Sequence, residues 1–138
     1  MSEIKTNKLT GTSTAGSILV TGEGNSTATS LQQGLAKAWI NFNGTGTVAV
    51  RDSYNISSLT DNNTGLYTLS WSNSFANDDY SNAGMSGQQS AAMINVSCTI
   101  DTTAPTTSAS QYNTMYENSG AGNFDCTQVT IQVYGDLA

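Results

Sequence analysis

The sequence predicts an all-β fold, an antiparallel β-sandwich or small barrel of jelly-roll-like type. Short stretches in which apolar and polar side chains alternate recur along the chain. Segments rich in Asn, Gly and Asp separate these stretches and are typical of turns. No stretch shows the apolar 3.6-residue period over ten or more residues that an amphipathic helix needs. Strands spaced by turns in this way indicate a sandwich or a barrel.

Residues 1–34 differ from the rest and are expected to form an extended N-terminal arm with one short strand. Isolated apolar residues lie among Lys, Thr and Ser, one β-prone stretch spans residues 17–21, and a loop follows at 22–27. Two interpretations stay open, namely an arm that becomes ordered only against a partner and a plain frayed terminus. The first makes four side chains candidates for partner binding: Ile4, Leu9, Ile18 and Val20.

Residues 35–138 are expected to form the β-sandwich domain, and its first half holds two predicted hairpins. In the first hairpin, a turn at 43–46 separates strands at 35–42 and 47–51. In the second, residues 54–59 and 66–71 flank a turn whose Asn and Gly residues tolerate positive φ. The first strand places apolar residues on one face and larger, partly polar ones on the other: Ala36, Ala38, Ile40 and Phe42 against Lys37, Trp39 and Asn41.

The second half of this domain is predicted from weaker signals. Residues 72–89 form a long polar stretch, interpreted as a loop with little regular structure. Three strands are expected, at 91–100, 108–115 and 127–134, with a Gly-rich turn at 117–123. The last strand should direct three apolar side chains into the core: Val129, Ile131 and Val133.

Large side chains fall on both faces of the predicted strands, as Trp39 and Ile40 do on the first. A second covered face is typical of a subunit interface, and a homotrimer would provide one. A sheet twisted over a loop of the same monomer is the alternative.

Composition excludes several classes of partner. Of 138 residues only four are basic, and the formal net charge is −6. Nucleic acids and anionic membranes are recognised through clustered Lys and Arg, so we expect neither as a partner. No apolar run is long enough to cross a bilayer, and the N-terminus lacks a signal-peptide pattern. We therefore expect synthesis in a cytoplasm and a neutral partner, such as another protein or a sugar.

The residue types also argue against catalysis. The chain has no His, so it cannot form the usual Ser-His-Asp triad or Cys-His pair of a nucleophilic enzyme. Carboxylates such as Asp78 and Asp79 are the remaining candidates for acid–base catalysis. Residues 61–72 lack the Glu that closes a calcium loop. Two cysteines cannot build a tetrahedral zinc site, and two buried thiols are favoured over a Cys98–Cys126 disulfide. We predict that the protein is not an enzyme and uses no cofactor or metal.

Aromatic residues in predicted loops offer a second set of candidate binding residues. Exposed rings could stack on sugars, whereas rings that fold inward would cap the core or pack between subunits. The candidates are Phe75, Tyr80, Tyr112 and Tyr116.

One segment is recognisable, namely LAKAWINFNGTGTVAVRDSYNISSLTDNNTGLYTL over residues 35–69. It resembles a domain common in structural proteins of marine tailed phages, including cyanophages. The opening IKTNKL and the ending VYGDLA are also similar to the termini of that family, whereas residues 72–125 match no fixed pattern. The resemblance implies a role on the phage surface and trimeric assembly, and it carries no catalytic residues.

These observations predict a virion surface protein, assembled in the host bacterial cytoplasm. The leading hypothesis is a capsid decoration or head-fibre protein that docks on other virion proteins through its arm. The alternative is the receptor-binding tip of a tail fibre, whose loops at 72–89 and 101–125 hold host surface glycan. A depolymerase is a third and weaker hypothesis.

Overall fold

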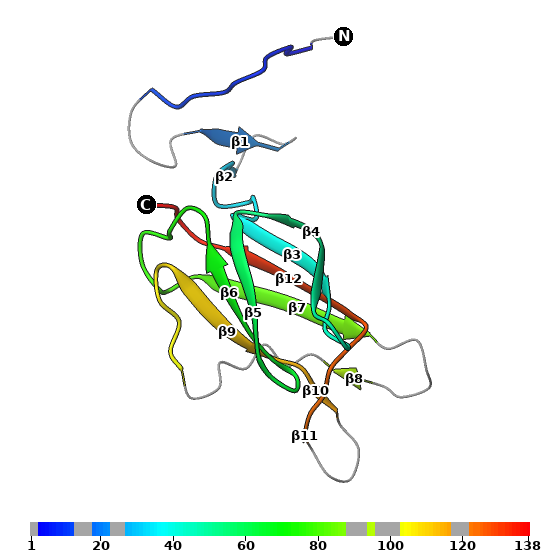
Figure 1. The fold of residues 1–138 in the computed structure, drawn as a ribbon. Helices are drawn as coiled ribbons and strands as arrows, with labels where there is room; N and C mark the ends of the chain where they lie inside the picture. Colours follow the sequence, from blue (N-terminus) through cyan, green and yellow to red (C-terminus); the bar gives the residue numbers. More distant parts are fainter. Residues whose placement is uncertain (1–2, 13–17, 23–26, 88–93, 96–102, 117–121) are drawn as a thin grey trace. The chain divides into compact units, whose positions relative to one another are not determined.

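The computed structural model describes residues 3–12, 18–22, 27–87, 94–95, 103–116 and 122–138. The chain divides into two compact units, Met1–Leu35 and Ala36–Ala138 (Figure 1). All regular elements in the described ranges are β-strands, which confirms the all-β prediction. Within those same ranges, no helix has the length and hydropathy to span a bilayer.

The N-terminal unit contains a small antiparallel hairpin of β1 (Leu19–Thr21) and β2 (Ala28–Ser30). A backbone hydrogen bond from Leu31 N to Ile18 O, at 2.8 Å, extends the ladder by one step. The sequence predicted only the first of these strands. The second, Ala-Thr-Ser, has little β-propensity of its own and is a strand because it pairs with β1.

Four strands form the larger sheet of the second unit, in the order β4-β3-β12-β7. Their bounds are Ala38–Asn43 for β3, Ala49–Tyr54 for β4, Ser81–Gly87 for β7 and Gln128–Tyr134 for β12. All pairs are antiparallel. The central strands alternate strictly between buried and less buried residues, which confirms the predicted inward row of Val129, Ile131 and Val133.

A second sheet has the order β5-β6-β9 and is also antiparallel. Its strands are Ile56–Asn63 (β5), Leu66–Trp71 (β6) and Ala109–Asn113 (β9). The predicted hairpin between the first two is confirmed, although the turn is tighter than expected because β5 continues to Asn63. Gly65 has a φ of 62°, a left-handed conformation that favours glycine in this turn.

Three two-residue strands make a third, small sheet in the order β11-β10-β8. They are Ile94–Asn95 (β8), Met115–Tyr116 (β10) and Gly122–Asn123 (β11). Most of the strand predicted at 91–100, and most of the turn predicted at 117–123, lies outside the described residues.

The two larger sheets pack face to face, and their buried faces share one core (Figure 1). The rings of Phe42 on β3 and Tyr67 on β6 meet edge to face, with centroids 4.9 Å apart. The sheets do not close on themselves, so the barrel alternative is wrong. Among the described residues, thirteen apolar side chains form the core: Ala38, Ile40, Phe42, Tyr67, Leu69, Trp71, Phe75, Tyr80, Tyr112, Cys126, Val129, Ile131 and Val133.

The predicted loop at 72–89 is wrong over its second half, where β7 forms an edge strand. Its sequence, SNAGMSG, contains no β-branched or aromatic residue and therefore carries no strand signal. All seven of its residues nevertheless pair with β12. Tertiary pairing, and not intrinsic propensity, makes this segment a strand.

Candidate binding surfaces

Three of the four candidate aromatic residues belong to the core, which is the inward-packing alternative that the sequence left open. Phe75, Tyr80 and Tyr112 are buried. The rings of Phe75 and Tyr80 lie 4.6 Å apart and both contact Trp71. The Tyr80 hydroxyl donates to the carbonyl oxygens of Thr106 and Ala109, both at 3.1 Å. These rings pack inward and present no face to a sugar, and the side chain of Tyr116 is outside the described part.

The N-terminal candidates are mostly exposed. Ile4 is 90% exposed, and Leu9 and Val20 are more than half exposed, whereas Ile18 is half-buried. The sequence did not single out two further exposed residues of this unit, Leu19 and Leu35. An open, largely apolar cavity of about 260 Å³ lies beside the hairpin and is lined by Val20, Thr29, Ser30, Leu31, Gly34 and Leu35.

A second surface is the outer face of the four-stranded sheet, opposite the core. Ala38, Ile40 and Phe42 of β3 point inward, so Trp39 and Asn41 must point outward. Residues directly opposite each other on paired strands share a face. The register therefore places one complete row on this face, running across all four strands in the order Tyr54, Trp39, Gln132 and Ala83.

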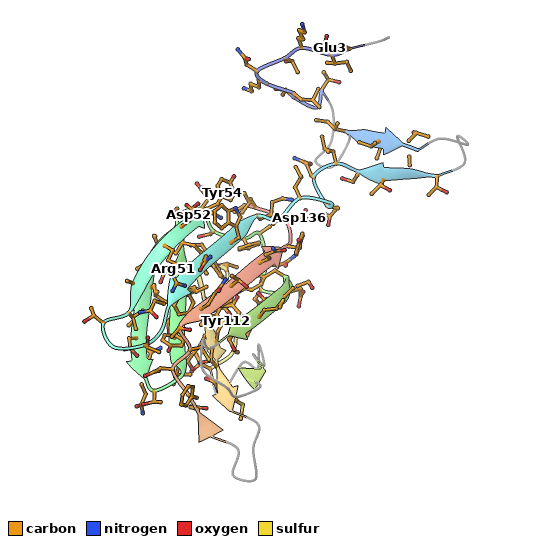
Figure 2. The ribbon with its side chains drawn as sticks, turned by 90° about the vertical axis from the view of Figure 1, so that its right-hand side faces the viewer. Glu3, Arg51, Asp52, Tyr54, Tyr112 and Asp136 are labelled. Atoms are coloured by element: carbon orange, nitrogen blue, oxygen red, sulfur yellow. The ribbon has the colours of Figure 1, made fainter. Side chains whose placement is uncertain are left out.

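A parallel row lies one pleat further along the same face. It runs across the strands in the order Asp52, Asn41, Thr130 and Met85. Tyr54 is 54% exposed and Met85 is 74% exposed, at opposite edges of the sheet. Figure 2 shows Arg51, Asp52 and Tyr54 in succession along β4.

A β-bulge at Arg51 sets the register of these rows. Asn41 pairs with Asp52 while Phe42 pairs with Val50, so Arg51 is the extra residue on β4. Its guanidinium donates to Asn41 Oδ1 at 3.3 Å, to the Phe42 carbonyl at 3.1 Å and to the Thr127 carbonyl at 2.5 Å. The side chain thus ties β4 to β3 and to the segment that enters β12.

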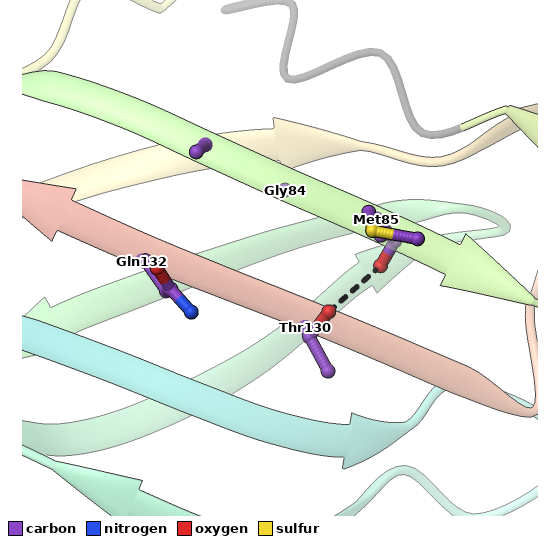
Figure 3. A pocket seen from close by; sticks show the side chains of 5 residues that line it. Gly84, Met85, Thr130 and Gln132 are labelled. Carbon is purple, nitrogen blue, oxygen red and sulfur yellow. Dashed lines mark hydrogen bonds between the residues drawn. The ribbon is translucent and has the colours of Figure 1, made fainter.

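A shallow groove marks the β7 side of this face, with a volume of about 180 Å³ (Figure 3). Ala83, Gly84 and Met85 line one side, and Thr130 and Gln132 line the other. The Thr130 hydroxyl donates to the Met85 carbonyl at 3.4 Å. The Tyr134 hydroxyl donates to Gln132 Oε1 at 2.8 Å, which leaves the Gln132 amide nitrogen as the end that presents donors.

The sequence treated Tyr54 as the first residue of the next strand, whereas the structure places it at the end of β4. The alternation of residues along β3 could have predicted this face, because it directs Trp39 away from the core side chains of the same strand. Its cross-strand neighbours could not be predicted without the register.

The remaining polar candidates do not gather into one site. Asp78 and Asp79 are exposed in the segment before β7, and Asp125 lies in another part of the unit. Among the described residues, no three His, Cys, Asp or Glu side chains lie close enough to share a metal ion. Cys126 is a buried free thiol, and Cys98 lies outside the described ranges.

Buried tyrosines are the described groups whose pKa departs from the ordinary value. Burial raises the pKa of Tyr67, and a hydrogen bond to Asp125 with its negative charge raises it further. Burial also raises the pKa of Tyr80. Both phenols therefore remain protonated at neutral pH and act as hydrogen-bond donors within the fold.

Comparison with known proteins gives no match. No family model matches the chain, and no curated protein or solved structure matches it significantly.

Proposed function

We propose that this chain is a structural protein of the virion surface of a tailed phage, a capsid decoration or head-fibre protein. In this proposal the N-terminal unit docks on other virion proteins and the second unit, a jelly-roll-like β-sandwich, projects from the particle. The observation that carries the proposal is the contrast between the two units. One is small and exposes large apolar side chains, whereas the other has a core of its own.

The N-terminal unit is poorly suited to stand alone in water. A two-stranded hairpin is at best marginally stable without further packing. Here the hairpin exposes Leu19 and Val20, and the segment before it exposes Ile4 and Leu9. Binding of a partner that covers these apolar side chains is favourable by about 25 cal/mol for each Å² of apolar surface removed from water. Such an arm is suited to bind along the surface of another protein.

Charge supports the same division of roles. Residues 1–35 contain two basic and two acidic residues, so their formal net charge is zero. Residues 36–138 contain two basic and eight acidic residues and carry the whole net charge of −6. Copies of the second unit repel one another in solution because each carries a net charge of −6. Copies of the neutral N-terminal unit do not repel one another in this way. We therefore propose that the homotrimer forms through the N-terminal unit, and not through the second face of the strands from which the sequence predicted it.

A particle-binding experiment tests the docking role. Phage particles would be prepared from a genome in which this gene is deleted, and the purified full chain would be added back. We expect the full chain to sediment with the particles, and a Leu9→Ser, Leu19→Ser, Val20→Ser variant to remain in the supernatant. The matched control, Val50→Ser, changes an exposed apolar residue of the second unit and should still bind. Equal binding of both variants, or no binding of the full chain, contradicts the proposal.

The alternative, a tail-fibre tip that binds host surface glycan, loses part of its basis. It relied on aromatic side chains in loops at 72–89 and 101–125, and Phe75, Tyr80 and Tyr112 are buried. Particle imaging that places this chain at the tip of a tail fibre would favour this alternative over the decoration protein.

A further inference from the structure

We propose that the outer face of the four-stranded sheet is a binding platform for a neutral oligosaccharide. This inference is independent of the proposed virion function. It rests on the two side-chain rows that the strand register builds on that face and on the groove beside them.

The aromatic end of the platform supplies stacking surface. Trp39 and Tyr54 are directly opposite each other on β3 and β4, and Tyr54 is 54% exposed. The face of an aromatic ring carries partial negative charge, and the C–H groups of a sugar ring carry partial positive charge. A pyranose ring laid on this pair would bury apolar surface while its hydroxyl groups stay at the rim.

The polar part of the platform supplies matched hydrogen-bonding groups. Gln132 follows Trp39 in the first row and is oriented by the Tyr134 hydroxyl, so its amide nitrogen presents donors. In the second row, Asn41 accepts from Arg51 through its amide oxygen, and Thr130 donates to Met85 through its hydroxyl. The Asn41 amide nitrogen remains as a donor, and the Thr130 oxygen and the Asp52 carboxylate remain as acceptors. Sugar hydroxyl groups both donate and accept, and they need a surface that offers both kinds of group.

The dimensions suit an extended ligand. Four adjacent strands span about 14 Å across a sheet, given a spacing of about 4.8 Å between neighbours. The row begins at the exposed Tyr54 and ends in the groove beside Ala83 and Gly84, where residues without bulky side chains leave about 180 Å³ of space. An oligosaccharide could therefore stack at one end and enter the groove at the other.

Charge and composition favour a neutral sugar over other occupants. The unit has a net charge of −6, and at the face itself Asp52 lies next to Arg51, so the two rows offer no cluster of basic side chains to an acidic glycan. Six of the eight side chains in the two rows can form hydrogen bonds, and one of them, Asp52, is charged, whereas the buried centre of a stable protein interface is depleted in charged residues. A flat, mixed surface of this kind matches a ligand that is itself half apolar and half hydroxyl.

Tryptophan fluorescence provides a direct test, because the chain has two Trp residues and one of them, Trp71, is buried. The full-length protein would be screened on an array of neutral and acidic bacterial-surface oligosaccharides, and each hit would then be titrated in solution. We expect a neutral oligosaccharide to bind and to change the Trp39 emission. The Trp39→Phe variant should lose this change while retaining the Trp71 emission.

Matched variants locate the site. Tyr54→Ala and Gln132→Ala should each weaken binding about tenfold, equivalent to about 1.4 kcal/mol, whereas Tyr54→Phe keeps the ring and should bind normally. Val50→Ala, on the same strand but outside the rows, should also bind normally. The inference is overturned if no oligosaccharide binds or if Tyr54→Ala and Gln132→Ala bind as well as the wild type. It is also overturned if Tyr54→Ala changes the oligomeric mass in solution, because the face would then be covered by a second copy.

Discussion

The hydroxyl of Tyr67 donates a hydrogen bond of 2.8 Å to Oδ1 of Asp125, and this bond joins β6 to the segment that leads into β12. The same carboxylate oxygen accepts from Gly65 N at 2.6 Å. The Gly44 carbonyl lies 3.2 Å from the phenol oxygen. Turns from both sheets therefore meet at one buried phenol and one carboxylate.

Substitution of Tyr67 by Phe should lower the free energy of unfolding by about 2 kcal/mol, because a hydrogen bond to a charged group is lost at a part-buried site. Tyr112→Phe is the matched control. Its hydroxyl bonds the neutral amide oxygen of Asn82 at 2.7 Å, so we expect a loss of about 1 kcal/mol. Urea denaturation of both variants measures the difference, and an equal or reversed order would show that the carboxylate adds nothing.

Alkaline pH should destabilise the protein through the same phenol. The folded-state pKa of Tyr67 is raised above its ordinary value of 10.0, so above pH 10 the unfolded chain loses a proton that the folded chain retains. The stabilising contribution is complete below pH 10 and is lost as pH rises through the folded-state pKa. Tyr80 contributes in the same direction. The stability of Tyr67→Phe should fall less steeply with pH, and identical slopes would contradict this assignment.

Gly65 should be the least replaceable glycine of the described part. A Cβ atom there would meet the Thr114 carbonyl oxygen and would lie 2.5 Å from the backbone nitrogen of Phe124, and the φ of 62° adds strain. Gly46 has a similar φ of 65° but nothing within 4 Å of the same position. We expect Gly46→Ala to cost about 1–2 kcal/mol, the left-handed penalty alone. Gly65→Ala should cost clearly more, and thermal unfolding of the two variants makes the comparison.

Arg51 should stabilise the bulge through geometry and not through charge alone. Its guanidinium bonds three oxygens, two of them backbone carbonyls on different segments. Arg51→Lys keeps the charge but lacks the planar fork, so we expect it to recover little of the loss seen in Arg51→Ala, about 1–2 kcal/mol. Full recovery in the lysine variant, measured by urea denaturation, would assign the effect to charge.

The second unit should fold without the first. The core residues that the structure describes all lie from Ala38 onward, so removal of residues 1–35 leaves these side chains in place. We expect the shortened chain to keep the far-ultraviolet circular dichroism of a β-protein and a cooperative unfolding transition. Loss of that transition would mean that the N-terminal unit supports the core.

The sequence predicted the central strands because apolar and polar residues alternate along them. Trp39, Ile40 and Val133 lie in stretches where period-2 patterning matches burial. It failed for β7, whose small polar residues form a strand only because β12 pairs with them. It left open whether Phe75 and Tyr80 are exposed or buried, because a polar local sequence does not reveal that a ring folds back over the core.

The candidate binding face was beyond prediction for a different reason. Its rows join residues from four strands, and Tyr54 is about eighty positions from Gln132 in the sequence. Their alignment depends on the single extra residue at Arg51, and a shift of one position would turn each side chain to the other face. Local patterns carry no information on that register.

Cryo-electron microscopy of particles that carry this protein would show which unit contacts the virion. We expect density for the β-sandwich to project from the particle surface. The N-terminal unit alone should contact the underlying virion protein, through Leu9, Leu19 and Val20. Density in which the sandwich lies against the particle through its outer sheet face, or particles without this chain, would contradict it.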